Sequence, residues 1–529
     1  DEQFTYDGQS RLASRVTAGT SGASGYAYRP GGQLATLTYP TGRSVIYSYD
    51  AQGRIIQVAT QPSGGSPVSV LAHNFGYGYP FASPSYYIFY YGNGISTWGY
   101  LTQDYRPSSR IDGPYTKGYG YDPSGDITGL GDNNGTSLTY AYDSTGRLVS
   151  AIDSASNGFG SLAWTYDKNG NRQSETRNAG TMPYTYSPPN WLYQKGSETR
   201  PRTANGNTAS TSTATFTYDG FNRLASSQTA AETTTYTYNA LGQRIKKINQ
   251  NGLATVFHYG PNGELLYEQD QAGNTKAYVW LDGRPLARID NDAQIYYYHV
   301  DHLGTPQAMT DAAGAVVWKA YYEPFGSATV RVNTVENNLR SPGQYSDRET
   351  GLYYNYFRDY DPTTGRYNEF DPIGLRGGLN GYTYVSNNPL RWIDPAGLAQ
   401  VSTGGEASGH AVLVGLGVGG GVTIDDDGTI CVYASGSLSF GLGIYAGAGF
   451  NVGGSTGSNT TGLSGSGGVF LEGGGGIAAG TEINVGTDGS VGGGKGFGGV
   501  GVGGAGGFRQ TGTATYCFNQ PKDDKGCKK

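Results

Sequence analysis

Aromatic and polar positions alternate in a unit that recurs along most of the chain. The unit is aromatic-x-Tyr-Asp, two or three turn residues with glycine, and then Arg-Leu or Arg-Ile. In a strand, residues i and i+2 face the same side, so the two aromatic rings would share a face. Asp/Asn-x-x-Gly supplies a turn that tolerates positive φ, and the Arg after the turn can pair with the Asp before it. We therefore predict a β-hairpin at each unit, namely at Phe4–Leu12, Tyr47–Ile55, Tyr140–Leu148, Phe216–Leu224 and Tyr236–Ile245.

The spacing of the units predicts how the hairpins join. Successive second aromatics fall about twenty residues apart, which leaves room for two strands and two turns. Hairpins that pair edge to edge would form a long, curling antiparallel sheet, so we expect an all-β fold. These second aromatics are Tyr218, Tyr238, Tyr259, Trp280 and Tyr298.

One stretch departs from this rhythm. Between Ala59 and Lys117 the Tyr-Asp unit is missing, and the aromatic cluster Phe75–Tyr100 takes its place. The stretch is either an insertion that plugs or caps the sheet, or a set of degenerate repeats. We favour degenerate repeats, because spacing often drifts in repeat arrays.

After Leu398 the pattern changes to apolar residues that alternate with Gly or Ser. Val412, Val414 and Leu416 begin this alternation, and the even positions from Leu438 onward continue it. Such a period of two predicts strands with one apolar face and one nearly bare face. The apolar face would either meet lipid, as in a membrane-active effector, or pack within a compact β domain or interaction element. The part of the chain after Leu398 contains a single histidine, His410. This scarcity disfavours a nuclease or transferase activity for that part.

Composition narrows the choice of partners. The chain has 529 residues, which predicts two or more units unless the fold is a repeat array. Its formal charge is −6 and it has no long block of Lys or Arg, so nucleic acid is not an implied partner. No apolar run has the length of a membrane-spanning helix. No signal peptide is visible, and the start at Asp1 without Met suggests a mature or truncated piece.

The cysteines all lie in the glycine-rich part of the chain. A disulfide between Cys517 and Cys527, or between Cys431 and Cys517, would fit an extracellular protein and leave one thiol over. Three unrelated thiols are the equally acceptable alternative.

We expect no metal and no cofactor. His299-Val-Asp301-His302 offers ligand types at close spacing, but the sequence nominates no third or fourth ligand, so a turn is favoured. Gly489–Lys495 resembles the front of a phosphate-binding loop, yet Gly496 stands where Ser or Thr must hold magnesium.

The segment Tyr353–Leu398 joins the two patterns and contains two similar pentapeptides. Asp371–Leu375 reads DPIGL and Asp394–Leu398 reads DPAGL, and the second ends where the composition changes. Two carboxyls held close cannot both ionise cheaply, so one acts as an acid while the other accepts a proton from water. That is peptide-hydrolysis chemistry, which suggests a processing site. Asp-Pro-x-Gly is also a common turn, and a purely structural role needs no catalysis.

The Tyr-Asp units resemble the YD or RHS repeats of bacterial Rhs proteins, of the C components of insecticidal Tc toxins and of the related teneurins. Tyr296–Asp311, Tyr321–Gly326 and the joining segment are similar to the RHS-associated core of the bacterial members, and the resemblance covers Asp1–Leu398. It implies a spiral antiparallel hairpin sheet wound into a hollow shell. The polypeptide behind the shell would be its enclosed cargo.

The resemblance also implies a self-cleaving site. The two protease aspartates of the family match Asp371 and Asp394, its Arg matches Arg358, and the cut falls between Leu398 and Ala399. Arg358 would steady the developing oxyanion or hold one Asp ionised. At most, then, the chain is an aspartic-type enzyme that turns over once, in cis.

In one place the chain departs from the family pattern. Before Asp371 it has Glu369-Phe370 where a small residue and Pro are expected. This puts the local backbone in doubt more than the carboxyl groups.

These observations combine into one organisation and two functional hypotheses. We expect a repeat shell at 1–295, an RHS-associated core at 296–398 and a glycine-rich domain at 399–529. The leading hypothesis is a secreted or cell-surface bacterial carrier of the polymorphic-toxin type that encloses and releases its tail. The alternative is a structural or adhesive protein whose repeats bind carbohydrate or a partner, with the tail as an assembly module. Membrane, cell-surface carbohydrate and an immunity protein stay open as further partners.

Overall fold

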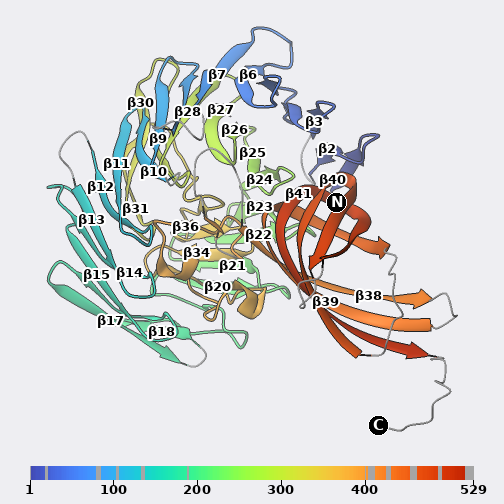
Figure 1. The fold of residues 1–529 in the computed structure, drawn as a ribbon. Coiled ribbons are helices and arrows are strands. Elements are labelled where there is room, and N and C mark those ends of the chain that lie inside the picture. Colours follow the sequence, from blue (N-terminus) through green and yellow to red (C-terminus); the bar gives the residue numbers. More distant parts are fainter. Residues whose placement is uncertain are drawn as a thin grey trace, which may run out of the picture. The chain divides into compact units, whose positions relative to one another are not determined.

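Figure 1 shows the fold in a computed structural model of the chain. The structure describes residues 2–17, 22–78, 85–102, 106–132, 137–187 and 190–398, and the backbone of the strands within 401–402, 412–424, 430–452, 462–485 and 491–518. The chain divides into two compact units, one made of Asp1–Thr5 and Leu12–Gly409 and the other of Tyr6–Arg11 and His410–Lys529.

The first large sheet has 19 strands among the described residues. From β2 onward each strand pairs antiparallel with the next strand of the sequence, so the sheet grows hairpin by hairpin. Its strands are β1 (Gln3–Tyr6), β2 (Leu12–Val16), β3 (Ala23–Tyr28), β4 (Leu34–Thr38), β5 (Ser44–Tyr49), β6 (Ile55–Gln61), β7 (Ser69–Tyr77), β8 (Ser85–Tyr91), β9 (Ser96–Leu101), β10 (Pro107–Asp112), β11 (Tyr115–Tyr121), β12 (Ile127–Gly131), β13 (Ser137–Tyr142), β14 (Leu148–Asp153), β15 (Ser161–Tyr166), β16 (Arg172–Arg177), β17 (Gly180–Ser187), β18 (Trp191–Lys195) and β19 (Glu198–Thr199).

The second large sheet has 12 strands in the described part of the chain and the same sequential order. Its strands are β20 (Ala214–Tyr218), β21 (Leu224–Thr229), β22 (Thr233–Tyr238), β23 (Arg244–Asn249), β24 (Ala254–Tyr259), β25 (Leu265–Asp270), β26 (Thr275–Leu281), β27 (Arg284–Asp290), β28 (Gln294–Val300), β29 (Pro306–Thr310), β30 (Val316–Tyr322) and β31 (Ala328–Asn333). The prediction of an all-β fold built from antiparallel hairpins is confirmed.

The Tyr-Asp units form the predicted hairpin turns. In one of them, Oδ1 of Asp143 accepts hydrogen bonds from the backbone N–H groups of Thr145 and Arg147, at 2.9 and 3.1 Å. Gly146 takes a φ of 79° within the turn, which favours glycine. Arg147 then reaches back to Asp143 at 2.6 Å. The same Asp–Arg pair recurs at Asp50–Arg54 and Asp219–Arg223, as predicted.

Each unit is also tied to its neighbour. The hydroxyl of Tyr166 donates to the carbonyl oxygen of Leu148 at 2.8 Å, while Arg147 stacks over the Tyr166 ring and donates to the carbonyl of Asp167. Such a bond from the second aromatic to the preceding hairpin is repeated by Tyr49, Tyr142, Tyr186, Tyr218, Tyr238, Tyr259 and Trp280.

The series of second aromatics ends one unit earlier than predicted. Tyr298 donates to Asn337 rather than to the preceding hairpin, and the strand position that Trp280 holds opposite Pro285 is taken by Val300 opposite Pro306.

The stretch between Ala59 and Lys117, where the Tyr-Asp unit is missing, continues the antiparallel pairing of the sheet. Strands β6–β11 pair in sequence order, which confirms degenerate repeats rather than an insertion.

The second sheet lies against the first as the next turn of a spiral. Residues of both sheets, including Leu37 and Val279, share one buried hydrophobic cluster. The hydroxyls of Tyr39 and Tyr91 donate across the contact to the carbonyl oxygens of Tyr278 and Tyr298, each at 2.7 Å. These bonds join residues that are far apart in sequence, so they set how one turn stacks on the next.

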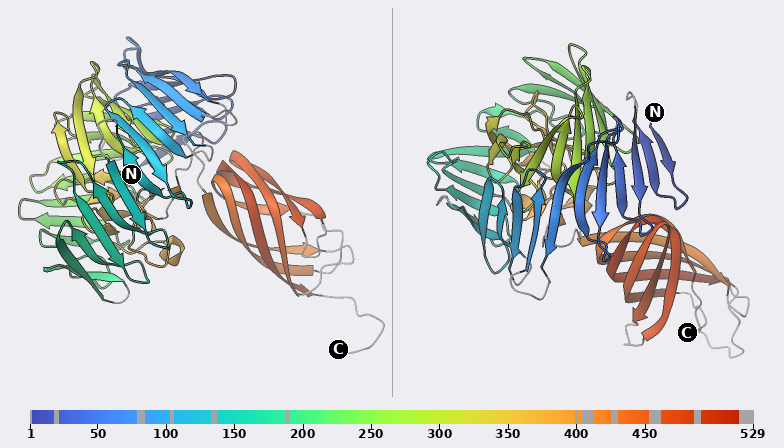
Figure 2. Two further views of the ribbon diagram at one scale, coloured as in Figure 1. Left: turned by 60° about the vertical axis from the view of Figure 1, so that its left-hand side comes forward. Right: turned by 90° about the horizontal axis from the view of Figure 1, so that it is seen from above.

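Residues 334–398, here called the core segment, pack against both sheets. Tyr345 and Tyr354 join a buried cluster with the second sheet, and Leu390 joins one with the first. In Figure 1, β34 and β36 lie among strands of both sheets, and Figure 2 shows the arrangement from two further sides. Its elements are β32 (Tyr345–Ser346), β33 (Tyr353–Asn355), β34 (Arg358–Asp361), β35 (Arg366–Tyr367), η1 (Gly374–Gly377), η2 (Val385–Asn387) and β36 (Trp392–Ile393), which pairs with β37 (Val401–Ser402).

The second unit contains four long strands in the order β38-β39-β41-β40. They are β38 (Val412–Ile424), β39 (Ile430–Val452), β40 (Gly462–Val485) and β41 (Val491–Phe518). Alternating apolar positions stand opposite one another in the register, such as Val414 opposite Phe440. Among the described residues of the whole chain, no helix is long and apolar enough to cross a membrane.

Candidate functional site

The two similar pentapeptides fold into turns of the same kind. In the first, the N–H of Gly374 donates to the carbonyl of Asp371 at 2.9 Å, and the N–H of Ile373 donates to Oδ1 of Asp371 at 3.0 Å. In the second, the N–H of Gly397 likewise donates to the carbonyl of Asp394 at 3.3 Å, and the N–H of Leu398 donates to Oδ1 of Asp394 at 2.9 Å. Pro after each Asp fixes φ and cannot compete as a donor, which suits a side-chain-capped turn.

Arg358, from β34, brings the two turns together. Its Nη2 lies 2.9 Å from Oδ2 of Asp371 and 3.3 Å from Oδ2 of Asp394. Its other nitrogens donate to backbone carbonyls, Nε to Gly397 at 2.5 Å and Nη1 to Gly381 at 2.9 Å. All three side chains are buried. The structure therefore places the two predicted aspartates against the guanidinium group of the predicted arginine.

Asp394 receives further donors that the sequence did not suggest. The hydroxyl of Tyr367 donates to its Oδ2 at 2.8 Å. Asn355 donates to that hydroxyl oxygen at 2.7 Å and to the backbone carbonyl of Asp394 at 2.9 Å. Together with Arg358 and the Leu398 amide, these donors stabilise a carboxylate and hold it in one orientation.

The carbonyl of Leu398 and the carboxyl of Asp371 both approach Gly377. A Cβ added to Gly377 would lie 2.2 Å from Oδ2 of Asp371 and 2.8 Å from the carbonyl oxygen of Leu398, so both oxygens flank the same point. Only a residue without a side chain fits between them. Ala399, the other partner of the predicted bond, lies outside the described residues.

Burial and the neighbouring charges change the acidity of Asp371. Burial raises the pKa of Asp371 to about 6; Arg358 opposes this rise and the nearby Asp394 adds to it. An acid that keeps its proton beside a carboxylate that can accept one is the arrangement that peptide hydrolysis requires. Arg358 contacts both carboxyl groups. This placement suits a role in holding the two carboxyls better than a role in stabilising the oxyanion that would form during hydrolysis.

The departure at Glu369-Phe370 leaves the turn intact. The N–H of Asp371 donates to the carbonyl of Gly381 at 3.0 Å, the same oxygen that binds Arg358. Phe370 packs edge-on against Tyr382, with ring centroids 5.5 Å apart, and occupies the space beside Gly381. The Phe370 ring thus occupies the space next to the backbone whose conformation was uncertain from the sequence.

The other candidate residues are accounted for differently. His299 bonds to Asp112 and to Thr310, both at 2.8 Å, and Asp301 caps a turn, as the favoured turn interpretation expects. No group of three metal-ligating side chains occurs among the described residues. Cys431 stands opposite Cys517 in the β39–β41 register, while Cys527 lies outside the described residues. Both disulfide pairings stay predictions.

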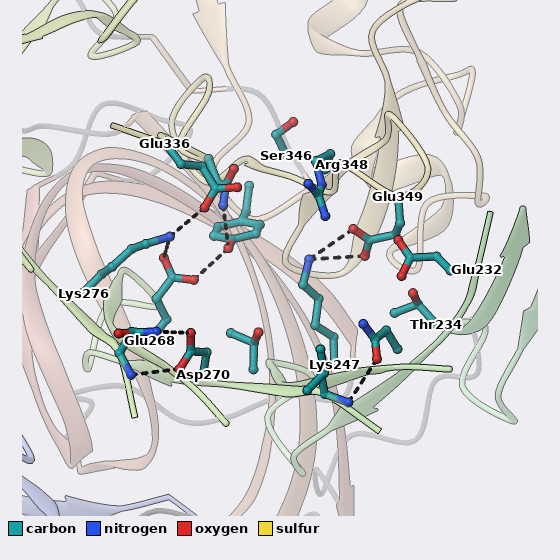
Figure 3. Close-up of a pocket in the computed structure, with 16 residues that line it drawn as sticks. Glu232, Thr234, Lys247, Glu268, Asp270, Lys276, Glu336, Ser346, Arg348 and Glu349 are labelled. Atoms are coloured by element: carbon teal, nitrogen blue, oxygen red, sulfur yellow. Dashed lines mark hydrogen bonds and ion pairs between the residues drawn. The ribbon is translucent and has the colours of Figure 1, made fainter. Parts of the chain in front are cut away.

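A polar pocket of about 260 Å³ lies where the core segment meets the second sheet (Figure 3). Lys276 sits between Glu268 of the sheet and Glu336 of the core segment, at 3.4 and 3.0 Å. Lys247 reaches Glu349 of the core segment at 3.2 Å. These ion pairs fasten the core segment to the sheet, so the pocket is part of the contact that holds the site in place.

Sequence reasoning missed three parts of the site. Tyr367, Asn355 and Gly377 act through contacts across turns, and none of them lies in a recognisable motif of its own. The nearest signal was the Gly-Gly within Leu375–Leu379, directly after the first pentapeptide, which indicates a close approach of backbone.

Hairpin repeats that pair in sequence order and pack around a core segment are the architecture of a β-shell protein. Residues 119–390 match the family model of the teneurin YD-shell, and residues 30–66 match that of the RHS repeat. The chain belongs to the YD-shell family.

Several toxins are among its relatives. Double-stranded DNA deaminase toxin A of Burkholderia cenocepacia (strain H111) is 33% identical over 349 residues, which are 58% of this chain and 24% of that protein. Toxin protein Tse5 of Pseudomonas aeruginosa is 29% identical, over 54% of this chain and 27% of that protein. The tRNA nuclease WapA of Bacillus subtilis (strain 168) is 31% identical, over 45% and 11%. This chain thus spans about a quarter or less of the length of these relatives.

Solved structures show the same fold. A crystal structure of TcdB2-TccC3-Cdc42 superposes with a TM-score of 0.64 at 20% identity, covering 75% of this chain and 24% of that chain. One of TcdB2-TccC3 gives a TM-score of 0.61 at 21% identity, over 71% and 22%. The hairpin repeats therefore form a hollow spiral shell of the Tc-toxin kind, as the sequence resemblance implied.

Proposed function

We propose that the chain is a toxin-type carrier whose β shell encloses a C-terminal polypeptide and whose core segment releases it by self-cleavage between Leu398 and Ala399. The observation that carries this proposal is the meeting of Asp371 and Asp394 on Arg358, beside the carbonyl of Leu398. The toxins among the relatives support a passenger behind the shell. They also support a secreted or cell-surface location.

In the proposed reaction, water adds to the carbonyl carbon of Leu398. Asp394 takes a proton from the water, and protonated Asp371 donates its proton to the carbonyl oxygen. Asp394 then gives the proton it took to the nitrogen of Ala399, which leaves as an amine when the C–N bond breaks, and one hydroxyl of the diol returns a proton to Asp371, so that Leu398 ends in a carboxyl group. Each chain reacts once, so no diffusible substrate is involved.

The pH dependence follows from Asp371. Its pKa of about 6 lies above the ordinary carboxyl value of 3.8, so its proton is present below that pH and is lost above it. Since the acid form is needed, cleavage should slow as the pH rises from about 6 to about 8, by close to tenfold per pH unit.

A denaturing gel tests the cleavage. The wild-type protein should run as two fragments, whereas Asp394→Asn and Asp371→Asn should run uncut. Both substitutions keep the shape of the side chain, so matching circular dichroism spectra would show that the fold is retained. An uncut wild type, or variants cut like it, would refute self-cleavage by this pair.

Protease protection tests the carrier role. If the shell encloses the passenger, the cut fragment should stay with the shell on a sizing column and resist added protease until the shell is denatured. A fragment that separates at once, or is digested while the shell is intact, would favour the adhesive alternative.

A further inference from the structure

The first strand after the proposed cut pairs with the last strand before it. Strands β36 and β37 run antiparallel, with Ile393 opposite Val401 and Trp392 opposite Ser402. The loop that joins them contains the second pentapeptide and the Leu398–Ala399 bond. The proposed cut therefore falls inside a hairpin, and it would leave the two paired strands in different fragments.

Strand β36 is firmly anchored in the core segment. Ile393 is buried, and Trp392 packs against a buried cluster made mostly of core-segment tyrosines. Just before the strand, Nε2 of His302 donates to the carbonyl oxygen of Leu390 at 2.8 Å, which ties this part of the core segment to the second sheet region. Pairing with β36 therefore holds β37 to a fixed part of the fold.

The backbone is held on both sides of the proposed cut. Before it, the carbonyl of Gly397 accepts a hydrogen bond from Nε of Arg358 at 2.5 Å, and the N–H of Leu398 donates to Asp394 at 2.9 Å. After it, Val401 is paired in β37. Two residues separate Leu398 from Val401, so the three steps between them span at most about 11 Å. The bond thus lies in a short stretch with both ends fixed.

The division of the chain into compact units agrees with this placement of β37. The unit that contains the core segment extends past Leu398 to Gly409, whereas the glycine-rich strands belong to the other unit. By its contacts, then, β37 belongs with the core segment, although it lies on the passenger side of the cut.

We infer that β37 is a clamp on the passenger side, whose pairing with β36 positions the Leu398–Ala399 bond for cleavage. The inference rests on the proposed function. A bond whose two sides are held loses less freedom on reaching the geometry for attack by water. The passenger residues through Ser402 would then serve the site, and the sequence beyond them would not matter for the cut. Two residues of pairing are marginal without the covalent loop, so β37 can leave β36 after the cut.

Hydrogen exchange tests the pairing without reference to cleavage. The Asp394→Asn variant supplies the whole chain. Hydrogen-bonded and non-bonded residue pairs alternate in an antiparallel ladder, so one of the Val401 and Ser402 amides should donate to β36. That amide should exchange at least about 10-fold more slowly than in the unfolded chain, as measured by mass spectrometry of overlapping peptides. Exchange of both amides at the unfolded rate would overturn the inference.

Paired substitutions test the role in cleavage. Val401→Pro together with Ser402→Pro removes both N–H groups and should slow cleavage by about 10-fold or more. Gly404→Pro together with Gly405→Pro is the matched control, because it places the same two prolines beyond β37, and it should cut at the wild-type rate. Val401→Thr together with Ser402→Thr keeps both N–H groups and the preference for a strand at residue 401, so it should also cut like the wild type.

The outcomes separate the clamp from the proposed function. Equal rates for the proline pair in β37 and the proline pair beyond it would overturn the clamp. Slowing by the threonine pair to the same degree would overturn it too, because the pairing depends on backbone groups. A wild type that never cuts would refute the proposed function, while the exchange measurement would still decide whether β37 pairs with β36.

Discussion

Gly377 offers a prediction whose size follows from the geometry. It lies in η1, and a Cβ added there would come within 2.2 Å of Oδ2 of Asp371 and 2.8 Å of the carbonyl oxygen of Leu398. Neither atom can move freely, because Asp371 is held by Arg358 and Leu398 by the N–H bond to Asp394. Gly377→Ala must therefore displace the acid by about 1.3 Å and the target carbonyl by about 0.7 Å to reach an ordinary contact near 3.5 Å.

A displacement of this size should matter for chemistry more than for stability. A misplacement of about 1 Å can slow a positioned reaction about 100-fold, which corresponds to about 2.7 kcal/mol of barrier. Gly377 does not take a positive φ, so Ala suits the backbone and loses less entropy on folding, by about 0.4–1 kcal/mol. Cleavage should fall sharply while the melting temperature changes little.

The assay is the time course of cleavage after the precursor is refolded from denaturant. Gly220→Ala is the matched control, since a Cβ there meets nothing within 4 Å and its φ is not positive. It should cut at the wild-type rate. Equal rates for Gly377→Ala and the control would refute the placement of Leu398 beside Asp371.

Two further predictions concern stability. Tyr39→Phe leaves the carbonyl of Tyr278 without its donor in a contact where Tyr39 is 1% exposed, so it should lower the free energy of unfolding by about 1–3 kcal/mol in denaturant titration. Tyr193→Phe, at a residue 52% exposed, is the control and should change little; an equal effect would contradict the stacking bond. For Asp359, the folded-state pKa of about 7 exceeds the ordinary 3.8, so the folded protein binds the extra proton and stability falls as pH rises through that window. Asp359→Asn should therefore gain stability over the wild type on the order of 3 kcal/mol between about pH 4 and about pH 7, and a pH-independent difference in melting temperature would contradict this.

The sequence predicted the local structure of the shell well, because the Tyr-Asp unit contains its own turn. Asp143, Gly146 and Arg147 interact within five residues, so their spacing is enough to indicate the hairpin and its ion pair. The twin pentapeptides were likewise visible as local turns. The one misplaced repeat, at Tyr298, arose because the residue that follows the bulge in β28 is Val300, which is not aromatic, so the spacing of aromatic residues could not locate it.

The contacts that make the site are not local, and the sequence could not predict them. Arg358 meets Asp394 through the packing of the core segment, which depends on clusters formed with both sheets. The roles of Tyr367 and Gly377 can be recognised only once those turns are brought together. The family resemblance identified the two aspartates. Their distances from Arg358 and the groups that donate hydrogen bonds to them are set by the fold.

The intact masses of the fragments produced by the wild-type chain and by its Asp394→Asn variant test the central claim most directly. The account predicts that the wild type yields one fragment that ends at Leu398 and another that begins at Ala399, and that the variant yields a single uncut chain. A wild type of full mass, a cut at another bond, or the same two masses from Asp394→Asn would contradict it.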